Sequence, residues 1–246
     1  MDTLTLVSAV VALAGAAVTA VLGYWAQRRL RTAEHRNLMD AYGASLAWAA
    51  YDLQSRLYNI LNRHTVTRGF LTAFILRGSP AEAEYARRST VFVLAEYLGW
   101  VEILRRDVQF LDLGGSRTNQ RVMLTITEIA RALNWTYAES SELRLFRAQQ
   151  RAIGELMVHP EGEPGRRRCL GYAEFSARLD TDEEFRGWFR PLLADVDALA
   201  ADTEPAVPRL VKVQWLLIEL LDLLDPRSER FPDYRRPFRE DPSGSA

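Results

Sequence analysis

The sequence has little of the residue types that most often carry chemistry, with one cysteine, Cys169, and three histidines, His35, His64 and His159. A single cysteine cannot form an intrachain disulfide, as expected for a protein in a reducing compartment. The four residues lie in different segments, without the spacing of zinc ligands, and no glycine-rich phosphate-binding loop is present. We therefore expect no cofactor, and no catalytic motif marks the chain as an enzyme.

Lysine is almost absent as well, because only Lys212 among 31 basic residues is a lysine. Such an excess of arginine, together with abundant alanine, is typical of proteins from GC-rich bacterial genomes. The formal net charge is −1, so the chain lacks the basic field that nucleic-acid binding requires, and we expect no nucleic-acid partner. Hydrophobic residues make up 48% of the chain, which is enough for a substantial core.

Charged residues are missing altogether between Leu4 and Trp25. As a helix this stretch is about 33 Å long, which matches the ~30 Å hydrocarbon core of a bilayer. Tyr24 and Trp25 close it with rings that favour the headgroup layer. The sequence therefore predicts one transmembrane anchor helix over residues 4–25, with the lipid bilayer as its partner and residues 1–3 as a short outer N-terminus.

The charges that flank this segment predict its orientation. Only Asp2 precedes it, whereas residues 26–36 form a basic juxtamembrane segment. The arginines of that segment are Arg28, Arg29, Arg31 and Arg36. Because basic residues near a span stay on the cytoplasmic side, we expect the N-terminus outside and the rest of the chain in the cytoplasm, at the inner (plasma) membrane.

Two alternatives to a retained anchor exist. Val18, Thr19 and Ala20 resemble a signal-peptidase site, so the segment could be a cleaved secretory signal, although it has no positive charge before its apolar stretch. It could also be an apolar helix buried in a soluble protein.

From residue 37 to residue 226 apolar residues recur every three or four positions, and no segment alternates as a strand does. This pattern predicts an all-α fold, with one cytoplasmic multi-helix bundle over residues 37–226. No proline or glycine pair interrupts the chain after the arginines, so we expect the anchor helix to continue into the bundle. Residues 227–246, rich in proline and arginine, are expected to be mostly loose, with Phe231, Tyr234 and Phe238 able to dock.

The predicted helices after the first begin with a long one, capped by Ser79 and ending near Leu113. It is apolar on nearly all sides from Val91 to Leu104, which predicts a central position in the bundle. Pro191 predicts a kink or a junction within its helix. The remaining helices are expected over residues 117–134, 141–158, 170–179, 182–200 and 207–224.

Glu96 is the strongest candidate for a catalytic carboxylate, because it lies among apolar residues where desolvation disfavours its charged form. The alternative is an ion pair with an arginine of a neighbouring helix, which would fix the packing. Glu102 precedes Arg105 and Arg106 by three and four residues, which is the spacing of ordinary same-helix ion pairs.

Two further clusters of charge are candidate sites. Glu219, Asp222 and Asp225 recur every three residues, so they could bind a divalent cation or an arginine-rich partner, or form the solvated edge of a core helix. Three arginines follow a proline- and glycine-rich loop over residues 159–165 and could contact an anionic surface, or else be exposed or paired with surface acids. These are Arg166, Arg167 and Arg168.

Five tryptophans stand at apolar positions of the predicted helices and are expected in the core. They are Trp48, Trp100, Trp135, Trp188 and Trp215. With no catalytic motif, the chain is best interpreted as a membrane-anchored interaction or scaffold protein that binds itself or another protein. The alternatives are a membrane-bound hydrolase or metal-dependent enzyme that uses carboxylates of the bundle, and a stress or defence effector that acts on the membrane.

Overall fold

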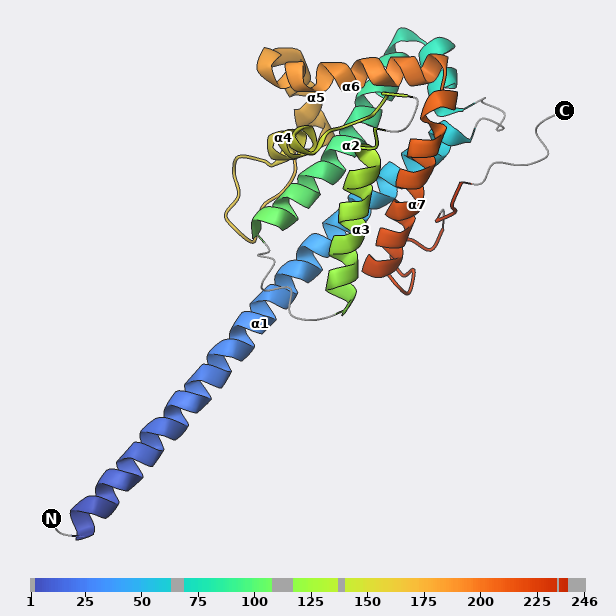
Figure 1. The fold of residues 1–246 in the computed structure, drawn as a ribbon. Helices are drawn as coiled ribbons and strands as arrows, with labels where there is room; N and C mark the ends of the chain where they lie inside the picture. Colours follow the sequence, from blue (N-terminus) through green and yellow to red (C-terminus); the bar gives the residue numbers. More distant parts are fainter. Residues whose placement is uncertain (1–2, 63–68, 108–116, 137–139, 234, 239–246) are drawn as a thin grey trace. The chain divides into compact units, whose positions relative to one another are not determined.

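The computed structural model describes residues 3–62, 69–107, 117–136, 140–233 and 235–238, and in residues 3–14, 26 and 28–41 it describes the backbone alone. The described part is helical, without a named strand, so the prediction of an all-α helical bundle is confirmed (Figure 1). One isolated antiparallel bridge joins Val158 to Cys169.

The first helix, α1 (Thr3–Leu61), runs without interruption from the predicted anchor into the bundle, as expected. The chain divides into two compact units, residues 1–41 and residues 42–246, and α1 contributes to both. As far as the helices are described, none has a stretch that is both long and apolar enough to cross a membrane. The side chains of residues 4–14, and of Arg28, Arg29, Arg31 and Arg36, lie outside the described ones.

The other elements follow α1 in a row of short and long helices. They are η1 (Thr72–Leu76), which is a π-helical turn, α2 (Pro80–Asp107), α3 (Arg117–Leu133), α4 (Arg147–Met157), α5 (Tyr172–Thr181), α6 (Glu183–Ala201), η2 (Glu204–Ala206) and α7 (Val207–Leu224). The bounds of α7 agree with the prediction, whereas the predicted last turns of α2, to Leu113, lie outside the described residues. Of the kink or junction predicted at Pro191, the junction was wrong, because α6 continues through this residue, and the kink stays a prediction.

Two helices begin where their capping residues predict. At α2 the Ser79 N–H donates to a Glu82 carboxylate oxygen at 2.7 Å, and the Glu82 N–H donates to Ser79 Oγ at 3.3 Å. This reciprocal pair is a capping box, and it satisfies two backbone donors that the helix itself leaves open. At α6 the Phe185 N–H donates to the Asp182 carboxylate at 2.9 Å.

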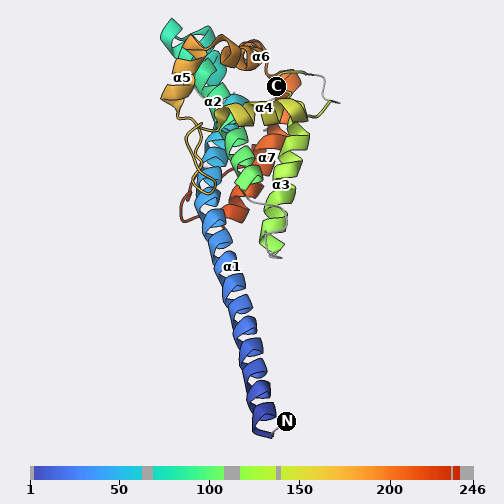
Figure 2. The same cartoon turned by 90° about the vertical axis from the view of Figure 1, so that its left-hand side faces the viewer.

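Helix α2 occupies the centre of the bundle, as its all-round apolar surface predicted. It packs against α4, α5, α6 and η1, and its residues from Val91 to Leu104 are mostly buried (Figures 1 and 2). The approach of α4 is close because each of the two helices has a glycine at the contact, Gly99 on α2 and Gly154 on α4. A Cβ on Gly99 would lie 2.8 Å from Met157 Cβ and 2.6 Å from Cys169 Sγ, and one on Gly154 would lie 2.7 Å from the Leu98 carbonyl oxygen.

Helices α3 and α7 form a second packed pair, lying side by side in both views (Figures 1 and 2). The part of α1 in the second unit contacts both layers. Its Arg56 donates to Ser89 Oγ of α2 at 3.0 Å, and its Gln54 accepts a hydrogen bond from Gln214 of α7 at 3.3 Å. The bundle core therefore lies where α1 meets α2 on one side and α7 on the other.

A buried arginine of α7 organises the segment before α4. Arg209 is fully buried and donates to the carbonyl oxygens of Trp135, Ser140 and Glu142 at 3.1, 2.6 and 2.7 Å. The helix predicted over residues 141–158 is present as α4, but its predicted start at Ser141 was wrong, because carbonyls that bind Arg209 are turned away from helical partners. Helix α4 instead begins at Arg147, where the Gln149 side chain accepts from the Phe146 N–H at 2.9 Å.

Replacing Arg209 by methionine should lower the free energy of unfolding by about 3 kcal/mol or more, because three carbonyl oxygens, one of them in a buried hydrogen bond, lose their donor. Urea denaturation followed by circular dichroism measures this change. Lys212→Met, one turn away and exposed, is the matched control and should stay within about 0.5 kcal/mol of the wild type. A loss below about 1 kcal/mol in Arg209→Met would contradict the organising role of this side chain.

Candidate functional site

Glu96 of α2 lies half-buried beside a second carboxylate, Asp52 of α1. Within the described residues no ion pair joins Glu96 to an arginine. The charged neighbour from another helix is an acid and not the arginine that the alternative interpretation required. Burial, together with repulsion from Asp52, raises the pKa of Glu96 to about 7, and a hydrogen bond from the Trp100 side chain opposes this rise. Glu96 is therefore poised to gain or lose a proton near neutral pH.

The surroundings of Asp52 limit the charge of this pair. Asp52 is exposed on one side, yet partial removal of water raises its pKa, and the neighbouring Arg56 opposes the rise. The Arg56 guanidinium lies 4.0 Å from the centre of the Phe70 ring and also contacts Tyr85. Burial lowers the pKa of Arg56. Arg56 is thus a cation that flanks the pair on the side of Asp52.

Cys169, a buried thiol, lies close to Glu96. Its Sγ lies 3.8 Å from the Glu96 carbonyl oxygen, and burial, with the nearby Glu96 charge, raises the pKa of the thiol. A thiol in this state is a poor nucleophile at neutral pH. The arrangement can bind a proton, and the catalytic role of Glu96 stays a prediction.

Glu102 is bound by the two arginines that follow it in α2. Its carboxylate accepts from Arg105 at 2.6 Å and from Arg106 at 2.7 Å. Burial alone would raise the pKa of Glu102, but these hydrogen bonds outweigh it and the pKa is lowered. The same-helix pairs that the spacing favoured are present.

The three acids predicted as a line on α7 do not converge. Glu219 is exposed, 3.8 Å from Arg121, while Asp222 lies 3.3 Å from Arg235. Asp225 is buried, and its carboxylate accepts from the N–H groups of residues 229–231. Over the described ranges of the chain, no group of three or more His, Cys, Asp or Glu side chains is placed to hold a metal ion.

Of the three arginines after the loop, one is turned inward. Arg167 Nε donates to the Asp107 carboxylate at 2.8 Å, and the Tyr42 hydroxyl donates to the same carboxylate at 2.6 Å. Arg168 is exposed along its length and donates to His159 Nε2 at 2.8 Å, while Arg166 is exposed. Only Arg166 and Arg168 can therefore reach an anionic surface without breaking a partly buried ion pair.

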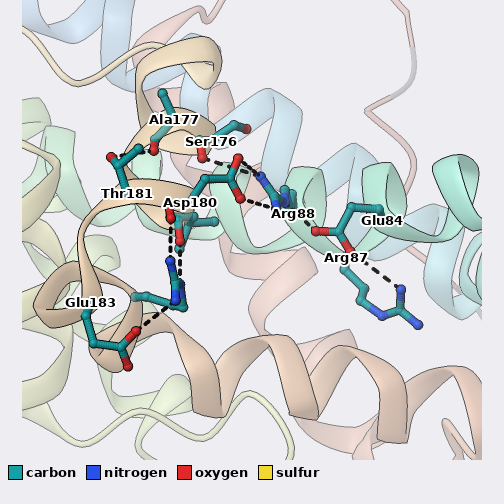
Figure 3. A network of polar contacts seen from close by, with 10 residues as sticks. Glu84, Arg87, Arg88, Ser176, Ala177, Asp180, Thr181 and Glu183 are labelled. Carbon is teal, nitrogen blue, oxygen red and sulfur yellow. Dashed lines mark hydrogen bonds and ion pairs between the residues drawn. The ribbon is translucent and has the colours of Figure 1, made fainter.

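A network of arginines and acids that the sequence did not indicate joins α2 to α5 and α6 (Figure 3). Arg88 of α2 donates to both carboxylate oxygens of Asp180 at 2.9 and 2.7 Å, and to Glu84 at 2.5 Å. Arg186 donates to the carbonyl oxygens of Leu179 and Asp180 and to Glu183. Because each guanidinium is engaged by oxygen acceptors, this network holds helices together and is no open anion site.

The tryptophans reveal a surface that the sequence had assigned to the core. The expectation was wrong for four of the five, since Trp48, Trp135, Trp188 and Trp215 are 54%, 37%, 45% and 49% exposed. Helix burial depends on which face a neighbouring helix covers, and these rings lie on uncovered faces. Only Trp100 is half-buried.

Trp135 and Trp215 line a groove of about 530 Å³ between α3 and α7, which we call the α3–α7 groove. Its other lining residues are Glu128, Arg131, Ala132, Pro208, Val211 and Lys212. Leu124, 65% exposed, stands one turn before Glu128 on the same face of α3. The sequence did contain a sign that these tryptophans are exposed. Glu128 and Arg131 lie on the same helix face as Trp135, and Lys212 lies on the same face as Trp215.

The chain matches no protein-family model, no curated protein and no solved structure. Its function is therefore inferred from the geometry of its own surfaces.

The proton on Glu96 should make stability depend on pH. The pKa of Glu96 is about 7 in the folded protein and 4.5 ordinarily. The stability that the Glu96 proton contributes is therefore fully present below pH 4.5 and is lost as the pH rises to about 7. Glu96→Gln, which cannot ionise, should exceed the wild type in unfolding free energy at pH 8 by about 1 to 2 kcal/mol, a range reduced for partial exposure.

Urea denaturation at a series of pH values from 4 to 8 tests this expectation. Glu184→Gln, at an exposed position of α6, is the control and should follow the wild-type profile. Parallel profiles for Glu96→Gln and the wild type would show that burial and Asp52 do not raise the pKa of Glu96 in the folded protein.

Proposed function

We propose that this protein is a membrane-tethered helical interaction module, and that its α3–α7 groove binds an amphipathic helix of a partner protein. The observation that carries the proposal is the exposure of Trp135 and Trp215, which line one groove, with the exposed Leu124 one turn before Glu128 on the same face of α3. Clustered exposed apolar side chains mark interaction sites in soluble domains, and tryptophan is enriched at the centres of interfaces.

The length of the groove suits a helix. Its lining residues run from Glu128 to Trp135 on the α3 side and from Pro208 to Trp215 on α7, about two helical turns or ~10 Å on each side. A partner helix laid between them would contact both with apolar residues at positions i, i+4 and i+7. Its burial would cover the two tryptophan rings.

The charges around the groove indicate the kind of helix that fits. Arg131 is paired with Glu128 at 2.6 Å, and Arg121 lies 3.8 Å from Glu219. In the described part of the chain no ion pair is formed by Lys212, which is exposed on the groove wall. We infer that the partner helix carries an acidic residue beside its apolar stripe, opposite Lys212.

The tether belongs to the same proposal. The uncharged segment 4–25, the arginines that follow it and the continuity of α1 from Thr3 to Leu61 support a single span with the N-terminus outside. The bundle would then work on the cytoplasmic face of a bacterial inner membrane. The tether would raise the local concentration of the bundle near membrane-bound partners.

Site-specific crosslinking tests the groove. A photoreactive residue in place of Trp135, in the full chain, should give adducts with a partner protein, and adding Leu124→Glu should remove at least about nine-tenths of them. The same photoreactive residue in place of the exposed Trp188 of α6 is the matched control and should give none of these adducts. Adducts with a second copy of the chain, or no adducts from position 135, would refute the proposed partner.

Deletion of residues 1–36 tests the tether. The full chain should sediment with membranes and resist carbonate extraction, whereas the shortened chain should be soluble, with a cooperative thermal transition. The measurement is the fraction of each protein that floats with lipid in a density gradient. A shortened chain that still floats with lipid would place the membrane contact elsewhere in the bundle.

A further inference from the structure

The C-terminal tail, residues 226–238 as far as they are described, lies along α1 and α7. Phe231 is buried between two aromatic residues of α1, with ring centres 4.6 Å from both Trp48 and Tyr51. It stacks on Tyr51 and meets Trp48 edge-on, which are favourable aromatic geometries. The ring therefore acts as an anchor in a preformed aromatic pocket.

Beyond Phe231 the tail is held through its backbone by one buried amide. Gln214 Nε2 donates to the Arg236 carbonyl oxygen at 3.0 Å, and Gln214 Oε1 accepts from the Phe238 N–H at 3.1 Å. The Trp215 indole N–H donates to the Phe238 carbonyl oxygen at 2.9 Å. Gln54 accepts from the same Gln214 amide at 3.3 Å and so positions it. These contacts bind main-chain groups, which any extended peptide presents.

Two acids at one end of the groove between α1 and α7 bind Arg235 of the tail. Arg235 contacts the carboxylate of Asp225, which is also buried, and lies 3.3 Å from Asp222. It also donates to the Asp225 carbonyl oxygen at 3.0 Å. The groove thus selects an aromatic residue and, four positions later, an arginine.

The described part of the tail leaves space in the groove between α1 and α7. A cavity of about 720 Å³ remains beside Asp233 and Arg236, walled by α1. The α1 residues that line it are Tyr51, Ser55, Tyr58 and Asn59, and Asn62 follows directly after the helix. Hydroxyl and amide groups make this wall suitable for further peptide backbone or polar side chains.

We propose that the groove between α1 and α7 is a second protein-binding site, which takes an extended peptide of another protein and which the chain's own tail occupies in its absence. The peptide carries an aromatic residue, an arginine four positions later and further residues that fill the cavity along α1. Trp215 contacts both this site and the α3–α7 groove, but peptide binding here does not depend on the function proposed for that groove.

The open cavity argues for a partner over the tail of a second copy. The tail is tethered next to the groove, at an effective concentration that for short linkers is in the millimolar range. The identical tail of another copy gains no contact that the tethered one lacks. A longer peptide of another protein gains the contacts along α1 and can therefore displace the tail.

The test uses a labelled synthetic peptide with the sequence of residues 229–238 and the full chain. Phe231→Ala should release the tethered tail and leave the aromatic pocket intact, so this variant should bind the probe at least about ten-fold more tightly than the wild type by fluorescence anisotropy. Adding Gln214→Ala should reverse the gain. A probe with alanine at its own first phenylalanine should not bind either protein.

A second variant guards against misfolding of Phe231→Ala. A chain that ends at residue 234 keeps Phe231 and frees Gln214 and Trp215, and it should bind the probe at least about three-fold more tightly than the wild type. Circular dichroism establishes that each variant is folded. A probe elongated by residues able to reach Tyr58 and Asn59 should bind more tightly than the short one.

Equal and weak binding of the probe by the wild type and by both folded variants would overturn the proposal and make the tail a purely structural element. Insensitivity to Gln214→Ala would place the peptide elsewhere. A wild-type mass in light scattering that is twice the chain's, and that falls to one chain in the variant ending at residue 234, would assign the groove to the tail of a second copy.

Discussion

A helix that is apolar on every side has to be covered on every side, and α2 imposes this condition on the whole bundle. Its central turns pack against α4, α5 and α6, and α1 reaches it through Arg56. Gly99 and Gly154 let α4 approach closely enough to remove water from that side. The same covering leaves Glu96 half-buried beside Asp52, so an unusual carboxyl pKa follows directly from how the core is closed.

Local chemistry explains what could be predicted from the sequence. The caps at Ser79 and Asp182 act within one helical turn, and the apolar period of α7 marks its ends at Val207 and Leu224. The start of α4 could not be predicted in this way, because it depends on Arg209, which is distant in the chain. Its three hydrogen bonds reorient a segment that has helical spacing by itself.

The candidate sites show the same division between local and distant information. Apolar neighbours within α2 indicate that the pKa of Glu96 is raised. Asp52 lies on another helix, and no pattern in the sequence links Asp52 to Glu96. The tryptophans have the spacing of core residues, and their exposure depends on where the bundle ends. Glu128, Arg131 and Lys212 on the same faces as Trp135 and Trp215 are the one local sign of that exposure.

Trp215 belongs to two surfaces at once, since its ring lines the α3–α7 groove while its indole N–H holds the carbonyl of Phe238. A single side-chain rotamer must therefore satisfy both. A ligand that binds one face and reorients this ring changes the free energy of the contact on the other face. Because thermodynamic linkage is reciprocal, a ligand on the other face has an effect of the same size in return. If partners bind at both faces, Trp215 would therefore couple the occupancy of one to the occupancy of the other.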